Sequence, residues 1–165
     1  MRVALLDAGG ASGAHALEAA GLGRRVTVTA PRGLDVALRA RKLGDRLATV
    51  PPAWAALRRG GFELAHAFSA EDALAAAGWR GPLVLTITAA PERAEIARRR
   101  VRLRSTLWAL GTADVVLAAD DAVADGLRRW YGVEARVLAT PQDHAAVYAG
   151  ALRATSSRMS AQRSR

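Results

Sequence analysis

With 165 residues the chain is long enough to form one domain with a sizeable core. The absence of cysteine excludes disulfides and thiolate metal sites. Hydrophobic residues make up 51% of the chain but aromatic residues only 5%, so alanine, leucine and valine must build the core. No apolar run reaches the roughly 18 residues that a membrane span needs, and Met1 leads into a strand pattern rather than a signal peptide. We therefore expect a cytoplasmic protein.

The net charge of +9 comes almost wholly from arginine, because Lys42 is the only lysine. A general preference for arginine over lysine explains this charge without any function. A basic surface that meets anionic lipid, phosphate or nucleic acid is the functional alternative. Composition alone leaves both explanations open.

The first segment pairs a strand with a glycine-rich turn. Residues 2–7 form an apolar run that predicts a buried strand, and a short helix follows at about 14–20. Glycine in the turn between them lets backbone N–H groups approach a ligand, and the helix start favours an anion. The spacing matches neither the dinucleotide fingerprint nor a P-loop, and a plain strand-to-helix turn is an equal alternative. The candidate ligand-binding residues of this turn are Gly9, Gly10, Ser12 and Gly13.

Two further strands are expected before the centre of the chain. Residues 25–30 alternate apolar with β-branched side chains and stop at a proline. No acidic residue ends this strand to hold a ribose, which argues against a nicotinamide cofactor. Residues 46–50 predict a short third strand closed by Pro51 and Pro52, and Pro52 then suits the first turn of a helix to about Arg59.

The centre of the expected sheet is a strand at residues 62–68, which follows a glycine pair and is largely apolar. Ser69 is placed to cap the alanine-rich helix that follows, with Glu71 and Asp72 in its first turn. A strand that runs straight into a helix start is half of a βαβ unit, and ligands bind at the carboxyl ends of such strands. His66 lies near that end.

The remainder of the chain continues to alternate strands with helices. Asp120 and Asp121 are placed to cap one of these helices, and Gly132 to end it. From Thr155 onward the chain is rich in serine and arginine and has no periodicity, which predicts a disordered tail. In order, we expect a helix at 71–77, a strand at 82–88, a long helix at 91–110, a strand at 113–119, a helix to 131, a strand at 134–138 and a helix at 143–154.

This alternation of about seven strands with helices predicts a three-layer α/β/α Rossmann-like sandwich with a mostly parallel sheet. The sequence shows no internal repeat, linker or second domain. We therefore expect one domain at residues 1–154, followed by a disordered basic tail at 155–165.

The long helix begins with a cluster of arginines that covers too wide an arc to be one stripe. A solvated face is the default explanation. Contact with anionic membrane lipid is the functional alternative, which would place the protein at the inner face of the membrane. Nucleic acid is the least favoured partner, because no aromatic residues are interleaved with the basic ones. The cluster consists of Arg93, Arg98, Arg99, Arg100, Arg102 and Arg104.

Each candidate side chain also has a purely structural explanation. His66 is either a catalytic base or, more simply, a strand-end histidine satisfied by its neighbours. Asp7 either faces the crevice and binds substrate or bonds loop amides. Glu71 is a substrate-binding candidate or a helix-start residue, and Asp120 a substrate-binding candidate or a cap. His15 and His144 have no acidic or histidine partners at ligand spacing, so no metal site is expected.

Four segments in a fixed order resemble a known family. They are 61–69 (GFELAHAFS), 82–88 (PLVLTIT), 113–119 (ADVVLAA) and 132–138 (GVEARVL). Together they are similar to the N-terminal, acceptor-side domain of a family 4 glycosyltransferase of the GT-B fold. The resemblance covers about residues 1–138.

The resemblance implies roles for several positions. In the family, Gly9 and Gly10 correspond to a glycine-rich loop beside the donor diphosphate. His66 and Ser69 correspond to a strand-end motif His-x-His-Ser in which Phe68 here replaces the second histidine. Thr86 and Thr88 correspond to the family motif Thr-x-His, in which Thr88 stands in place of the histidine. The resemblance implies that both positions bind substrate.

The resemblance also implies what the chain would need. The family has a second domain that holds most of the nucleotide-sugar donor, whereas here the helix at 143–154 follows directly and looks like the family's C-terminal crossing helix. We therefore expect a glycosyltransferase-like acceptor domain that uses a nucleotide sugar as substrate, has no cofactor, and needs a partner chain for the donor site. The alternatives are a non-catalytic sugar-, lipid- or nucleotide-binding domain or partner subunit, and a basic surface-binding protein.

Overall fold

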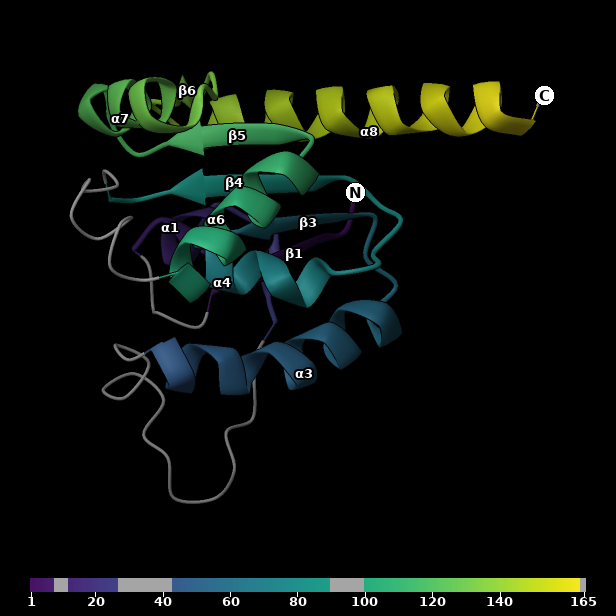
Figure 1. Ribbon diagram of the computed structural model, residues 1–165. Helices are drawn as coiled ribbons and strands as arrows, with labels where there is room; N and C mark the ends of the chain where they lie inside the picture. Colours follow the sequence, from purple (N-terminus) through teal and green to yellow (C-terminus); the bar gives the residue numbers. More distant parts are fainter. Residues whose placement is uncertain (8–11, 27–42, 90–99, 164–165) are drawn as a thin grey trace.

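The computed structural model describes residues 1–7, 12–26, 43–89 and 100–163. Within these residues the centre is a six-stranded sheet in the order β2-β1-β3-β4-β5-β6, with every neighbouring pair parallel (Figure 1). The strands are β1 (Val3–Leu6), β2 (Arg24–Arg25), β3 (Leu64–Ala67), β4 (Leu83–Ile87), β5 (Val115–Ala118) and β6 (Arg136–Val137).

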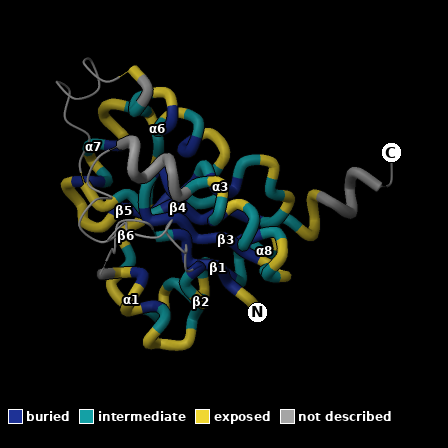
Figure 2. Tube along the Cα trace, turned by 90° about the horizontal axis from the view of Figure 1, so that it is seen from below, coloured by how far each residue is buried: buried dark blue, intermediate teal, exposed yellow. Residues whose placement is uncertain are grey.

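The neighbouring strands β1 and β3 are buried on both faces. All four residues of β1 and all four of β3 are buried, which is why their sequences are continuous apolar runs rather than alternating ones. Figure 2 shows these strands as the buried centre of the molecule. His66 lies in β3 between Leu5 of β1 and Val84 of β4, so it occupies the middle of the sheet.

Helices cover both faces of the sheet and complete three layers. On one face Leu57, Ala73 and Leu127 pack with the strand residues in one core cluster. On the other face Leu17 and Tyr148 belong to a second cluster. The first face is covered by α3 (Leu43–Arg59), α4 (Ala70–Ala73), the 3₁₀ turn η1 (Leu74–Ala76), α6 (Arg100–Thr112) and α7 (Asp121–Tyr131), and the second by α1 (Ser12–Ala19) and α8 (Pro141–Arg163). The predicted α/β/α Rossmann-like sandwich is confirmed.

The third strand expected at residues 46–50 is wrong, because this segment lies inside α3. The helix continues through Pro51 and Pro52 instead of starting there. Its second half buries Ala53 and Leu57 in the core, and this packing outweighs the local preference that the prolines suggested. The sheet consequently has six strands in the described residues rather than seven. Most of the strand expected at 25–30 lies outside the described residues.

The disordered tail expected from Thr155 is also wrong as far as Arg163, because α8 continues to that residue. The hydroxyls of Ser156 and Ser157 donate to backbone carbonyls one turn earlier, at 3.0 and 3.1 Å. The Arg158 guanidinium pairs with Asp114 at 2.9 Å, which ties this part of the helix to the start of β5. Figure 1 shows α8 continuing beyond the sheet toward the C-terminus.

The helix ends follow the sequence signals closely. The Asp120 side chain caps α7 by accepting a hydrogen bond from the Val123 N–H at 2.8 Å. Gly132 ends the same helix with φ +65°, in the left-handed region that favours glycine. No helix among the described residues has the length and apolar character to span a bilayer.

Two glycine substitutions should have opposite effects on stability. Gly132→Ala forces an alanine into a left-handed conformation, and we expect it to lower the free energy of unfolding by about 1 kcal/mol. Gly150→Ala lies inside α8, where an added Cβ meets no atom within 4 Å, and should raise it by up to about 1 kcal/mol. Denaturant unfolding of both variants measures this, and a stabilising Gly132→Ala would contradict the assigned helix end.

Candidate functional site

The carboxyl edge of the sheet collects most of the candidate residues. Because all strands are parallel, Asp7, Ser69, Thr88 and Asp120 follow the ends of β1, β3, β4 and β5 at one edge. The strand order reverses beside β1, which has β2 on one side and β3 on the other. Ligands of open parallel sheets bind outside the carboxyl ends at such a reversal. The edge between β1 and β3 is therefore the candidate site.

His66 is fully buried and both of its ring nitrogens have partners. Its Nδ1 is 2.6 Å from the hydroxyl of Tyr148 in α8, and its Nε2 is 2.7 Å from the hydroxyl of Thr86 in β4. Both hydroxyls can donate or accept, so a neutral imidazole can satisfy both contacts. The contacts link the central strand, its neighbour and the last helix.

Burial, together with a smaller effect of the nearby His144, lowers the pKa of His66 to about 3. Burial also raises the pKa of Tyr148 above its usual value. His66 is thus a neutral side chain near pH 7. With no exposed surface and both ring nitrogens hydrogen-bonded, it joins α8 to the sheet.

An aromatic cluster surrounds His66 and was not foreseen from the sequence. The Phe68 ring stacks on His66 with 4.3 Å between centroids, and the His144 ring lies 5.8 Å away. His144 is half-buried, and its Nδ1 is 3.1 Å from the Thr140 carbonyl at the start of α8. The spacing of His144 and Tyr148, one helical turn apart, is the signal that would have placed both on one face.

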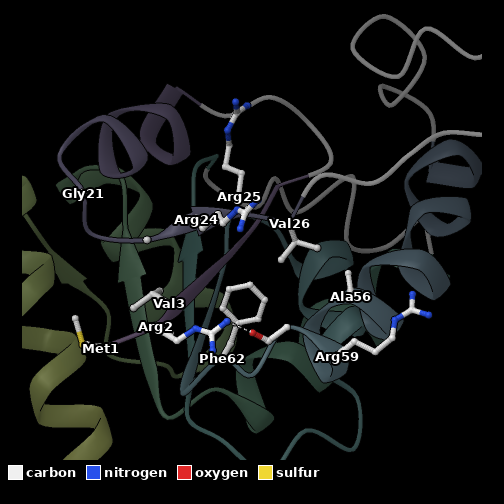
Figure 3. A pocket seen from close by; sticks show the side chains of 12 residues that line it. Met1, Arg2, Val3, Gly21, Arg24, Arg25, Val26, Ala56, Arg59 and Phe62 are labelled. Carbon is white, nitrogen blue, oxygen red and sulfur yellow. Dashed lines mark hydrogen bonds between the residues drawn. The ribbon is translucent and has the colours of Figure 1, made fainter.

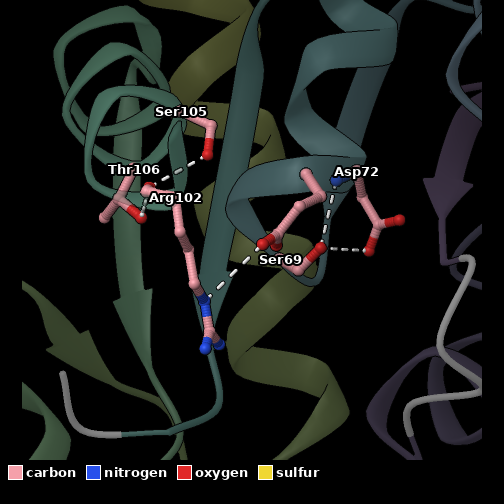
Figure 4. A network of polar contacts seen from close by, with 6 residues as sticks. Ser69, Asp72, Arg102, Ser105 and Thr106 are labelled. Carbon is pink, nitrogen blue, oxygen red and sulfur yellow. Dashed lines mark hydrogen bonds and ion pairs between the residues drawn. The ribbon is translucent and has the colours of Figure 1, made fainter. Parts of the chain in front are cut away.

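The start of α4 holds two buried acidic residues. Ser69 caps this helix, since its Oγ accepts from the Asp72 N–H at 3.0 Å and donates to the Asp72 carboxylate at 2.8 Å (Figure 4). Glu71 is 4% exposed and pairs with Arg102 of α6 at 3.7 Å. Figure 4 shows these groups converging between α4 and α6. Their helix-start role is thus visible in the structure, while Ser69 remains half-buried at the candidate edge.

The other candidate residues divide into three groups. Thr88 is exposed just after β4, and Asp7 is half-buried just after β1. Gly13 lies against Phe68, because a Cβ added there would meet the ring at 3.3 Å. Outside the described residues lie Gly9, Gly10, Arg93, Arg98 and Arg99, together with the side chain of Ser12, whose backbone begins α1.

Two of the described arginines in the basic cluster differ from the third. Arg100 and Arg104 are exposed on α6, whereas Arg102 pairs with Glu71. Among the described residues no three histidine, aspartate or glutamate side chains lie close enough to hold a metal ion.

A comparison of the sequence with protein families identifies a match. The model of Glycosyltransferase Family 4 matches residues 3–143. The chain belongs to glycosyltransferase family 4. The matched region of this family 4 chain runs from β1 to the first turn of α8 and includes the whole sheet. The expected resemblance is therefore confirmed, and no curated protein matches the chain.

The buried histidine should make stability depend on pH. The pKa of His66 is about 3 in the folded chain against 6.5 for an exposed histidine, so the unfolded state binds a proton first. The free energy of unfolding therefore falls as the pH drops from 6.5 toward 3, because protonation of His66 favours the unfolded chain. The limiting slope is about 1.4 kcal/mol per pH unit.

His66→Gln removes this titration while keeping groups that can bond both hydroxyls. Between about pH 7.5 and 5 the unmodified chain should lose about 2 kcal/mol more of its unfolding free energy than the variant. Denaturant titrations at the two pH values measure this difference. Equal losses in both proteins would show that His66 is not held neutral.

Proposed function

We propose that this family 4 chain supplies the acceptor side of a glycosyl-transfer cleft and that a partner chain supplies the donor side. The observation that carries the proposal is the match to the family over residues 3–143, together with a parallel sheet whose order reverses between the candidate residues of β1 and β3. A nucleotide sugar would be the donor substrate.

The described residues at this edge suit an acceptor rich in hydroxyls. Thr88 offers an exposed hydroxyl, and Ser69, Asp7 and His144 are half-buried polar groups at the same edge. Such groups can orient a sugar or polyol by hydrogen bonds without carrying out proton transfer themselves. Binding and orientation would be the contribution of this side of the cleft.

The donor diphosphate needs positive groups or backbone N–H donors where its charge develops. Helix α1 begins at Ser12, directly at the candidate edge, and a helix start with nearby glycines favours an anion. We assign one side of the diphosphate site to Gly9, Gly10 and the first turn of α1. The grip on the donor sugar would come from the partner chain.

The course of the chain after the sheet supports a separate donor side. Strand β6 ends at Val137 and α8 begins at Pro141, and α8 then buries Tyr148 and Ala151 against the sheet. The last helix thus packs on the same unit as the family match. This arrangement leaves the carboxyl edge as the surface that would face the donor side of the cleft.

A second candidate function is binding without transfer, favoured by the complete burial of His66. With both ring nitrogens hydrogen-bonded, this side chain is no accessible base at the position where a catalytic histidine was expected. The domain would then bind a sugar or lipid-linked sugar as a partner subunit. The exposed Arg100 and Arg104 on α6 would favour binding of the domain to an anionic membrane surface on the cytoplasmic side.

A transfer assay separates the two functions. The chain is incubated with nucleotide sugars and polyol or lipid-linked acceptors, alone and with candidate partner chains. Transfer only in the presence of a partner is the expected result. Transfer by the purified monomer would contradict the need for a partner, and acceptor binding without transfer in every combination would favour the second function.

A matched pair of variants tests the assigned edge. Thr88→Val removes the exposed hydroxyl after β4 and should lower kcat/KM in the active combination by about tenfold, the effect of one lost hydrogen bond of about 1.4 kcal/mol. Thr112→Val removes an exposed hydroxyl at the end of α6 and should leave kcat/KM unchanged. Equal effects of the two variants would exclude the carboxyl edge as the acceptor site.

A further inference from the structure

A second pocket opens at the opposite, amino edge of the sheet (Figure 3). It has a volume of about 580 Å³ and lies beside the starts of β1 and β3, along β2 and at the end of α3. This volume falls within the range of roughly 300–1,000 Å³ that small-molecule sites occupy. The pocket is separate from the carboxyl edge, because the strands lie between them.

The pocket is lined by cationic groups and by no acidic side chain among the described residues. Four arginines belong to its lining. Two carboxylates stand outside it, Glu63 beside Met1 and Glu18 beside one arginine. Cations therefore exceed carboxylates here. The arginines that line the pocket are Arg2, Arg24, Arg25 and Arg59.

Two of the four arginines are fixed in place by other groups. The Arg2 guanidinium donates to the Gly60 carbonyl at 2.5 Å, and Figure 3 shows it beside the Phe62 ring, 5.9 Å from the ring centroid. Arg25 pairs with Glu18 at 2.5 Å. These two arginines thus form a fixed part of the wall.

The other two arginines, Arg24 and Arg59, are exposed and have no ion pair or hydrogen bond within the described part of the chain. The last turn of α3 carries the negative end of the helix dipole, which favours a cation there. The dipole therefore explains Arg59 without a ligand. That explanation does not extend to Arg24, which lies in the edge strand β2. Both guanidinium groups are available to a ligand.

We infer that this pocket binds a phosphate-bearing ligand, a phosphomonoester or a diphosphate, through Arg24 and Arg59. Guanidinium groups bind phosphate oxygens in a bidentate, charge-assisted manner, and several of them around one pocket compensate a multiply charged anion. Arg2, held by the neutral Gly60 carbonyl, adds a fixed positive charge, whereas the charge of Arg25 is compensated by Glu18. The phosphate belongs either to a soluble molecule or to a lipid headgroup, both of which present the same chemistry.

The inference does not depend on the proposed sugar transfer, because the pocket and the acceptor edge lie at opposite ends of the strands. A binding measurement without any sugar substrate therefore tests it alone. Calorimetric titration of the full chain with inorganic pyrophosphate is the first arm. Sedimentation with phosphatidylcholine vesicles that contain phosphatidic acid, against phosphatidylcholine alone, is the second.

Matched double variants separate a site from general attraction. Arg24→Gln with Arg59→Gln should weaken binding by at least about tenfold, the equivalent of one charge-assisted contact. Arg136→Gln with Arg153→Gln removes the same charge from exposed positions outside the pocket and should leave affinity within about twofold. Lysine at positions 24 and 59 keeps the charge but loses the bidentate fork, so it should give an intermediate affinity.

The outcomes decide both the inference and the source of the phosphate. Pyrophosphate binding that depends on Arg24 and Arg59 indicates a soluble ligand, and vesicle binding alone with the same dependence indicates a lipid headgroup. Equal losses in the two double variants would overturn the inference, since general charge attraction would then explain the binding. Absence of binding in both arms would overturn it as well.

Discussion

The hydrogen bonds of His66 to Tyr148 and Thr86 connect three elements of the fold, the strands β3 and β4 and the helix α8. His66 and Tyr148 are 82 residues apart. A buried imidazole without partners would be costly, and here both ring nitrogens find hydroxyls. The same contact fixes the position of α8, because its buried tyrosine must reach the middle strand. The packing of α8 on this face of the sheet therefore depends in part on this contact, beside buried Ala151 and the Arg158–Asp114 ion pair.

This constraint also shapes the chemistry of the candidate site. His66, buried in the core, is no exposed base here. The described polar groups at the carboxyl edge are hydroxyls, the half-buried Asp7 and His144, and the exposed Asp120, which caps α7. These groups suit binding and orientation more than proton transfer. The amino edge differs in kind, because cationic side chains gather there around a pocket. One parallel sheet thus presents two edges of different chemistry.

Local signals predicted much of the fold. The strands β3, β4 and β5, the cap at Ser69 and the helix end at Gly132 follow from patterns of a few neighbouring residues. These features depend on short-range burial and hydrogen bonding, which the sequence displays directly.

Features decided by distant contacts could not be predicted in this way. The segment 46–50 has a strand-like local pattern, but it is helical because it belongs to α3, which packs on the sheet through Leu57. That packing partner cannot be read from the segment itself. The extension of α8 depends in part on Arg158 meeting Asp114. The state of His66 depends on Tyr148, whose approach requires the whole sheet to be formed. In the candidate site, sequence reasoning therefore anticipated which residues follow the strand ends, but not that both ring nitrogens of His66 are hydrogen-bonded in the core.

Ring-nitrogen NMR of the His66 imidazole tests the central claim most directly, because it reports the protonation state of that side chain alone. Our account predicts one protonated and one unprotonated ring nitrogen from neutral pH down to about pH 4, since the pKa of His66 is about 3. A His66 imidazole that takes up a proton with a midpoint near 6.5 in the folded chain, as an exposed histidine does, would contradict it.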